Sequence, residues 1–199
     1  MGLSTRKYNK KECITFKSTS GKYGALSNMS PGYPVTINKV IIRNVELLYQ
    51  ALRYPDYPEI QKRIIGYSSP ISAKQYARTH IEKTRSDWNT QRFKIMKFCI
   101  ELKLHQNKEL FSQALLSTFD LPIVEFTSED KVWGATDEGD YYSGTNALGR
   151  LLMELRERVK KNEFKISIPP IPQLIFINVE ITTDSIKFTP NNTLPFKSI

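Results

Sequence analysis

The stretch NVELLYQALRYP, residues 44–55, predicts a helix that is apolar on both sides of a narrow polar stripe. Asn44 is a suitable N-cap, and the prolines at the end of the segment stop the helix. The polar side chains fall at i, i+3, i+4 and i+7 and so share one face: Glu46, Tyr49, Gln50 and Arg53. In the first turn the helix dipole favours an ionised Glu46, which suits a base or a group that stabilises a developing cation. The same pattern also fits an ordinary first-turn glutamate.

Short strands and further helices surround this segment. Runs of β-branched residues predict strands at 12–18, 35–42 and 122–127. Cap and proline signals predict helices at 59–67, 69–78, 87–105 and 147–161, and one that begins at Asn107 with Leu110, Phe111, Ala114 and Leu115 on one side. Residues 129–146 are predicted to form a polar, glycine-bearing loop. Beyond IPPIP, the segments LIFINVEI (174–181) and SIKF (185–188) predict strands of an appendage.

These elements predict an α+β, mostly helical single domain with short N-terminal strands and a small β appendage at the C-terminus. We assign residues 1–161 to this domain, and we expect the extension of residues 162–199 to pack on it. A chain of 199 residues can bury such a core without disulfides or metal.

The charge of the chain favours a polyanionic partner. Lys and Arg exceed Asp and Glu by 29 to 20, which gives a net charge of +9. A cation placed near a phosphate releases condensed counterions, so nucleic acid or a phosphorylated small molecule is the leading partner class. Basic residues are spread along the chain, however, and each cluster alone also fits a solvated surface.

Several functional classes are disfavoured by what the sequence lacks. It has no apolar run of membrane-spanning length and no secretory signal, so we expect a cytoplasmic protein without membrane contact. The four possible soft metal ligands are Cys13, Cys99, His80 and His105, and their spacing matches neither a zinc site nor a disulfide framework. We therefore expect no metal and no cofactor.

Two further segments place polar groups inside core-like patterns. In SPISAKQYAR, Lys74 lies between Ala73 and Ala77, where partial burial would lower its pKa and make it nucleophilic. Such a lysine more often extends to solvent. In VEFTSEDKVWGA, three acidic residues precede Trp133, an arrangement that can stack a base or sugar and hold its polar edge. A tryptophan that anchors a loop in the core fits this pattern equally well.

Taken in order, seven segments resemble the NADAR family, which has the YbiA-like fold. They are LSNMSPGYP (26–34), ELLYQALRYP (46–55), SPISAK (69–74), RSDW (85–88), KFCIELKLHQN (97–107), LLSTFDLPIVEFTSEDKVWG (115–134) and GTNALGRLLMELRE (144–157). The resemblance extends from residue 16 to about residue 161. Several motifs in a fixed order are far more specific than any one of them.

One branch of the family is more similar than the rest. YbiA-like members usually carry Glu-His-Tyr in the first helix, whereas this chain has Glu46, Leu47, Leu48 and Tyr49. This version resembles the NADAR antitoxins encoded beside DarT-type toxins, which ADP-ribosylate DNA. The resemblance implies an ADP-ribosylglycohydrolase that hydrolyses the N-glycosidic bond between ADP-ribose and guanine. Leu47 in place of histidine removes a possible proton donor of the YbiA-like members.

The resemblance also implies which residues act. By position in the motifs, the catalytic candidates are Glu46, Lys74 and Asp130. The candidates that hold ADP-ribose and the base are Asn28, Gln50, Arg53, Arg85, Trp88, Trp133, Gly134 and Asn146. The implied partners are single-stranded DNA with ADP-ribosylated guanine, ADP-ribose as product, and a cognate DarT-type toxin. Two alternatives stay open: an N-glycosidase of phosphorylated riboflavin-pathway intermediates, and a binding module without chemistry.

Overall fold

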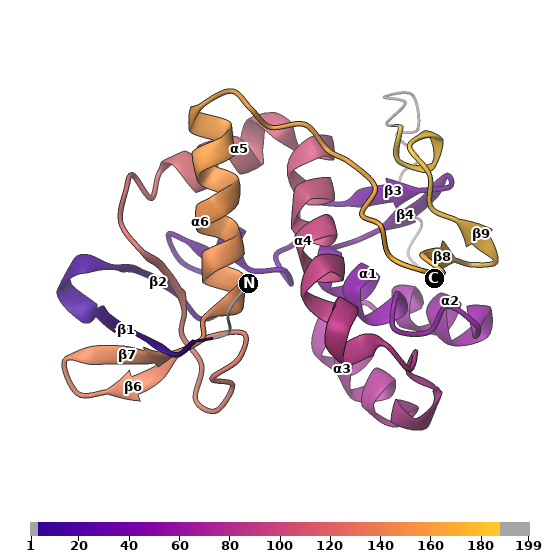
Figure 1. Cartoon of the computed structure of the whole chain (residues 1–199), viewed down its shortest axis with the longest axis horizontal. Helices are drawn as coiled ribbons and strands as arrows, with labels where there is room; N and C mark the ends of the chain where they lie inside the picture. The colour runs from indigo at the N-terminus through magenta and orange to yellow at the C-terminus, as the bar shows by residue number, and fades with distance from the viewer. Residues whose placement is uncertain (1–3, 188–199) are drawn as a thin grey trace.

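The computed structural model describes residues 4–187, which form helices and several small sheets (Figure 1). Two long helices, α4 (Trp88–Gln106) and α6 (Ala147–Lys160), pack against each other, and α5 (Lys108–Leu116) contacts both. Two of the small sheets lie on the α6 side, and the other two lie on the α4 side with α1 (Val45–Ala51), α2 (Pro58–Gly66) and α3 (Pro70–Arg78). This arrangement is the predicted α+β, mostly helical fold.

The first helix, α1, is buried on every side. Asn44 caps it as predicted, since its Oδ1 accepts a hydrogen bond from the Leu47 amide at 3.2 Å. Helices α2, α3 and α4 all contact it, and each of its seven residues is buried. The polar stripe of α1 is therefore inside the molecule, where each charged group needs a partner.

Within residues 4–187, the strands form four small sheets. An antiparallel sheet has the order β1 (Arg6–Asn9), β7 (Tyr141–Gly144), β6 (Thr136–Glu138). Strand β2 (Ile14–Phe16) pairs in parallel with β5 (Ile123–Glu125), so that Phe16 lies opposite Glu125. Two hairpins complete the set: β3 (Val35–Ile37) with β4 (Val40–Ile42), and β8 (Ile175–Phe176) with β9 (Val179–Glu180). Short 3₁₀ turns span Lys10–Glu12, Gly24–Leu26, Ile81–Lys83 and Asp184–Ile186.

Some local predictions were wrong. The strand expected at 35–42 is a hairpin, because Asn38 and Lys39 both adopt positive φ and form a tight turn. The expected loop at 129–146 contains the hairpin of β6 and β7. Leu110 is 59% exposed and does not join Phe111 in the core. The Asn107 side chain makes no cap; it donates hydrogen bonds to the carbonyls of residues 34 and 103.

Beyond α6, the C-terminal strap (residues 161–187) crosses over α4 to the far side of the molecule, where β8 and β9 lie near α2 (Figure 1). Apolar side chains of the strap are buried in the main core: Ile171, Leu174, Phe176, Ile181 and Ile186. The segment SIKF begins in a 3₁₀ turn where we expected a strand, and residues 188–199 lie outside the described residues. Among residues 4–187, none of the helices combines the length and apolarity that crossing a bilayer requires.

Candidate functional site

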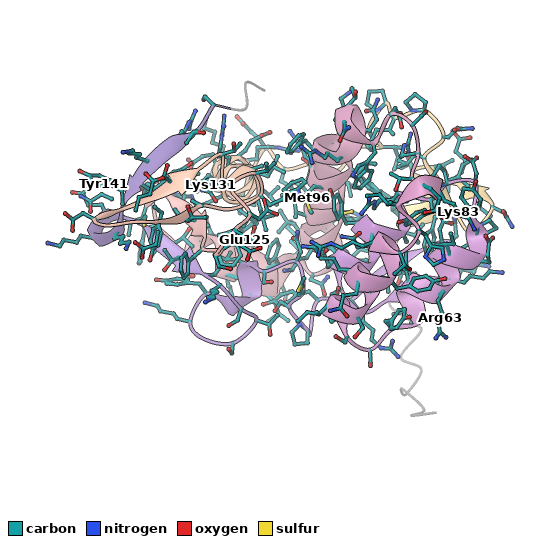
Figure 2. The ribbon with its side chains drawn as sticks, turned by 90° about the horizontal axis from the view of Figure 1, so that it is seen from below. Arg63, Lys83, Met96, Glu125, Lys131 and Tyr141 are labelled. Carbon is teal, nitrogen blue, oxygen red and sulfur yellow. The ribbon has the colours of Figure 1, made fainter. Side chains whose placement is uncertain are left out.

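Three charged side chains act electrostatically on Glu125, the last residue of β5, which Figure 2 labels. Burial raises the pKa of Glu125 to about 7, and the charges of Glu46 and Asp130 raise it as well, while Lys74 lowers it. The structure thus brings all three predicted catalytic residues within electrostatic reach of one carboxyl group. We call Glu46, Lys74, Glu125 and Asp130 the charged cluster.

Hydrogen bonds along α1 hold Glu46 in place. Glu46 is 6% exposed, and its Oε1 accepts a hydrogen bond from Gln50 Nε2 at 2.8 Å. The Gln50 Oε1 in turn accepts one from Arg53 Nη1 at 3.4 Å, and Arg53 Nη2 donates to Thr84 Oγ1 at 3.3 Å. The predicted polar stripe is therefore a continuous hydrogen-bonded row that fixes the Glu46 carboxylate.

A row of aromatic rings extends from the end of α1 toward the Asp130 loop. The ring centroid of Tyr49 lies 5.1 Å from that of Trp88 and 5.6 Å from that of Trp133. Trp133 continues the row to Phe93 at 5.0 Å. The two tryptophans and Phe93 are partly exposed, and the Arg53 guanidinium lies 4.9 Å from the Trp88 ring. Such a row offers flat faces for a base or a ribose.

Asn28 supplies a buried acceptor that is free to meet a ligand. Its side chain is 5% exposed, and its Nδ2 lies 3.0 Å from Met96 Sδ on α4 (Figure 2). Within residues 4–187, its Oδ1 has no hydrogen-bond partner. The Asn28 carbonyl accepts a hydrogen bond from the Glu46 amide at 3.2 Å, which ties this loop to α1. Since an unpaired buried acceptor is costly, a ligand donor is its natural partner.

The loop that carries Asp130 and Trp133 is fastened to α6. Asp130 Oδ1 accepts hydrogen bonds from the amides of Val132 at 3.0 Å and Trp133 at 2.9 Å. In addition, the amides of Ala147 and Leu148 donate to the carbonyls of Val132 and Trp133, both at 3.0 Å. One oxygen of Asp130 is therefore engaged in the turn, and the Trp133 ring is held against the aromatic row.

Two residues predicted to touch the ligand instead shape the backbone beside Glu125. Asn146 is fully buried; its Nδ2 donates to the Ile123 carbonyl at 2.8 Å, and its Oδ1 accepts from the Glu125 amide at 3.1 Å. A Cβ atom on Gly134 would lie 2.3 Å from the Glu125 carbonyl oxygen, so only glycine fits there. Both residues position the strand end that carries Glu125.

Arg85 lies outside the charged cluster, and its role in holding the ligand stays a prediction. Its Nε lies 2.5 Å from Asp87 Oδ1, and the hydrogen bond lowers the pKa of that carboxyl. Its Nη2 and Nη1 donate to the carbonyls of Pro172 and Gln173, at 2.5 and 3.4 Å. The side chain is buried, and its donors are used to fasten the C-terminal strap.

The sequence prediction missed Glu125, Arg92 and Phe93 as site residues. Glu125 stands in the quoted VEFTSED segment, and its position at the end of an apolar strand was the available signal. Arg92 and Phe93 lie on α4, with the guanidinium 4.8 Å from the ring, and are recognisable only once α4 is placed beside Trp133. No three His, Cys, Asp or Glu residues in the range 4–187 form a group suited to a metal ion.

This arrangement provides a carboxylate, a carboxyl group with raised pKa, an amine and flat aromatic faces. A carboxyl whose pKa lies near neutrality can donate a proton to a leaving group, and a second carboxylate can stabilise positive charge. These are the two requirements for cleavage of a bond between a sugar carbon and a base nitrogen.

Comparison with known proteins places this geometry in a family. Residues 15–160 match the NADAR domain. The chain is 34% identical over 146 residues to N-glycosidase YbiA of Escherichia coli (strain K12), covering 73% of this chain and 88% of that protein. It is 31% identical over 149 residues to riboflavin biosynthesis protein VVA0006 of Vibrio vulnificus (strain YJ016), covering 75% and 39%.

A solved structure agrees with these sequence matches. The NMR structure of E. coli YbiA superposes with a TM-score of 0.64 at 27% identity, over 86% of this chain and 100% of that one. The matched domain, the shared fold and the named relatives show that this chain belongs to the NADAR family of N-glycosidases.

Proposed function

We propose that the protein hydrolyses the N-glycosidic bond between ADP-ribose and a guanine base in single-stranded DNA. It would thereby act as the antitoxin to a DarT-type toxin. The observation that carries the proposal is the charged cluster of Glu46, Lys74, Glu125 and Asp130 next to the aromatic row. The net charge of +9 supports a DNA substrate over a free metabolite, and the Leu47–Leu48 pair resembles the antitoxin branch of the family.

The cluster assigns a role to each carboxyl group. Glu125 in its acid form donates its proton to the guanine nitrogen as the bond to C1 of the ribose breaks, and the bonding electron pair leaves with the base. Glu46 stabilises the positive charge that develops at C1. Water then adds to C1, and the proton it releases returns to Glu125. The products are free ADP-ribose and intact guanine.

Lys74 provides a second route to the same products. If the ribose ring opens, its Nζ can attack C1, expel the base and form a Schiff base. Hydrolysis of this Schiff base returns the amine and releases ADP-ribose. Asp130 then orients the ribose with the oxygen that the Trp133 turn leaves free.

The direct test uses a single-stranded oligonucleotide that carries one ADP-ribosylated guanine. Wild-type protein should release ADP-ribose and restore guanine, as read by gel mobility and mass spectrometry. Glu46→Gln should retain binding and lose turnover, because the amide keeps the shape and removes the charge. Unchanged turnover in this variant would end the assignment of Glu46. A substrate that is bound and never cleaved would favour the binding module without chemistry.

The names of the relatives favour a second candidate function. One is called an N-glycosidase and another a riboflavin biosynthesis protein. The same cluster could therefore cleave a phosphorylated intermediate of that pathway, which also contains a bond between a ribosyl carbon and nitrogen. Parallel assays of this intermediate and of the DNA substrate separate the two functions, because we expect the DNA substrate to have the higher kcat/KM.

A further inference from the structure

A pocket lined by Phe126, the residue that follows Glu125, is not used by the proposed chemistry. Its volume is about 330 Å³, at the lower end of the range of small-molecule sites. The loop between β2 and the 3₁₀ turn at Gly24 forms most of its wall, and Phe126 closes the side next to β5. We call it the basic aromatic pocket; its chemistry comes from Lys17, Ser18, Ser20, Lys22, Tyr23 and Phe126.

Lysines and aromatic rings alternate around this pocket. Lys17 Nζ lies 5.1 Å from the centroid of the Phe126 ring, and Lys22 Nζ lies 5.2 Å from that of Tyr23. Both lysines are exposed, and in the described part of the chain neither forms an ion pair with a carboxylate. The Phe126 ring continues to Tyr142, with centroids 5.3 Å apart. Uncompensated cations beside stacking faces are typical of surfaces that bind single-stranded nucleic acid.

The backbone connects this pocket to the charged cluster by two short paths. Phe126 directly follows Glu125, and its amide donates to the Phe16 carbonyl at 2.9 Å in the β2–β5 pair. On the other wall, Gly24 precedes Asn28 by four residues, and the Asn28 carbonyl accepts from the Glu46 amide. The pocket is therefore lined by residues that adjoin the residues of the charged cluster and Asn28 in the chain.

We propose that the basic aromatic pocket binds a nucleotide adjacent to the modified guanine in single-stranded DNA, an inference that rests on the proposed function. The base stacks on Phe126 or Tyr23, and the flanking phosphates pair with Lys17 and Lys22. The serine hydroxyls of the loop, with Ser18 Oγ 2.9 Å from Ser20 Oγ, supply additional donors to a phosphate.

The test measures fluorescence anisotropy with an unmodified, labelled single-stranded 12-mer. Lys17→Gln/Lys22→Gln should weaken binding about tenfold and reduce the slope of log Kd against log salt by about 1.4, since each phosphate contact contributes about 0.7. Lys62→Gln/Lys161→Gln removes the same charge from exposed positions on α2 and after α6, and should change Kd less than twofold. Phe126→Leu should weaken binding about tenfold through lost stacking, with circular dichroism as the folding check.

The outcomes separate this inference from the proposed function. The proposal that the pocket binds DNA would be overturned if both double lysine variants weakened binding equally. It would also be overturned if the wild type did not bind the 12-mer. Where hydrolysis occurs, Lys17→Gln/Lys22→Gln should lower the ratio of kcat/KM for the modified oligonucleotide to that for an ADP-ribosylated deoxyguanosine about tenfold. An unchanged ratio would mean that the pocket does not bind the DNA strand during catalysis. If the protein hydrolyses neither substrate but binds the 12-mer in a way that depends on Lys17 and Lys22, the proposed function would be refuted. The proposal that the pocket binds DNA would still hold.

Discussion

Glu125 is the residue whose proposed chemical role is hardest to predict from its position in the sequence. The sequence places it at the end of a predicted strand, as the first of three acidic residues before Trp133, and folding brings it where the charges of Glu46, Asp130 and Lys74 act on it. Burial and the two like charges keep it protonated up to a pH of about 7. A glutamate in this state is an acid that can protonate a leaving base in neutral solution.

This gives a pH prediction for the wild type and for Glu125→Gln. If the acid form is required, kcat/KM on the ADP-ribosylated oligonucleotide should fall as the pH rises through about 7. Glu125→Gln cannot donate the proton, so its kcat/KM should be lower by roughly 10²- to 10⁴-fold and should lack this decrease. The measurement is a profile from pH 5.5 to 9. Glu129→Gln, an exposed neighbour, is the control and should retain the wild-type profile; a normal profile in Glu125→Gln would rule out the acid role.

A second residue-scale prediction concerns Lys74. Its side chain is partly buried on α3, between the buried Ala73 and Ala77. If the Schiff-base route operates, borohydride added during turnover should fix the ribosyl group on the protein, and peptide mass spectrometry should locate it at residue 74. Lys74→Arg keeps the charge and should give no adduct, whereas Lys131→Arg should give the wild-type yield. Turnover without any adduct would leave only direct attack by water.

Interactions between residues close together in the sequence could be predicted, whereas those between distant segments could not. The i, i+4 spacing indicated that Glu46 and Gln50 interact, and the structure confirms their hydrogen bond. Glu125 becomes part of the site only because folding brings it within electrostatic reach of Glu46 on α1, a residue distant in the chain. Arg85 fits its motif in the sequence, but its partners are carbonyls almost ninety residues later.

At the scale of elements, helices were predictable because their ends are encoded locally. The proline and serine that open α3 predicted residues 69–78, and the helix spans Pro70–Arg78. Strands β6 and β7 were missed because β7, with which β6 pairs, is held in the sheet by β1, a partner more than 130 residues away. Two exposed acidic residues in β6 also hide the alternation that marks a strand.

The junction of α2 with the C-terminal strap gives an element-scale prediction. Gln61 is fully buried; its Nε2 donates to the Ile175 carbonyl at 2.9 Å, and its Oε1 accepts from the Ile177 amide at 2.6 Å. Gln61→Leu leaves both strap groups unpaired, so the free energy of unfolding should fall by about 1–3 kcal/mol. Urea unfolding measures this, with Gln75→Leu on exposed α3 surface as the control. Equal effects of the two variants would contradict a stabilising junction.

At the scale of the whole molecule, one buried lysine links the helical core to the two proposed ligand-binding surfaces. Lys103 on α4 is 1% exposed, and its Nζ donates to the carbonyls of Ala25 at 2.6 Å and Ser27 at 3.0 Å. The ammonium also lies 4.2 Å from the centroid of the Phe111 ring. These contacts hold the loop that runs from the basic aromatic pocket to Asn28, so both surfaces depend on this one side chain.

Because it is buried, Lys103 should also make the stability of the molecule depend on pH. Burial lowers its pKa from 10.5 to about 7, so between these values the unfolded chain carries a proton that the native protein lacks. The free energy of unfolding should therefore rise with pH across this window, by up to about 1.4 kcal/mol per pH unit. Lys103→Met fills similar space without a titrating group. We expect the stability difference, wild type minus Lys103→Met, to increase from pH 7 to pH 9 in urea unfolding. A difference that stays constant with pH would show that Lys103 remains charged in the folded protein, stabilised by its carbonyl and aromatic contacts.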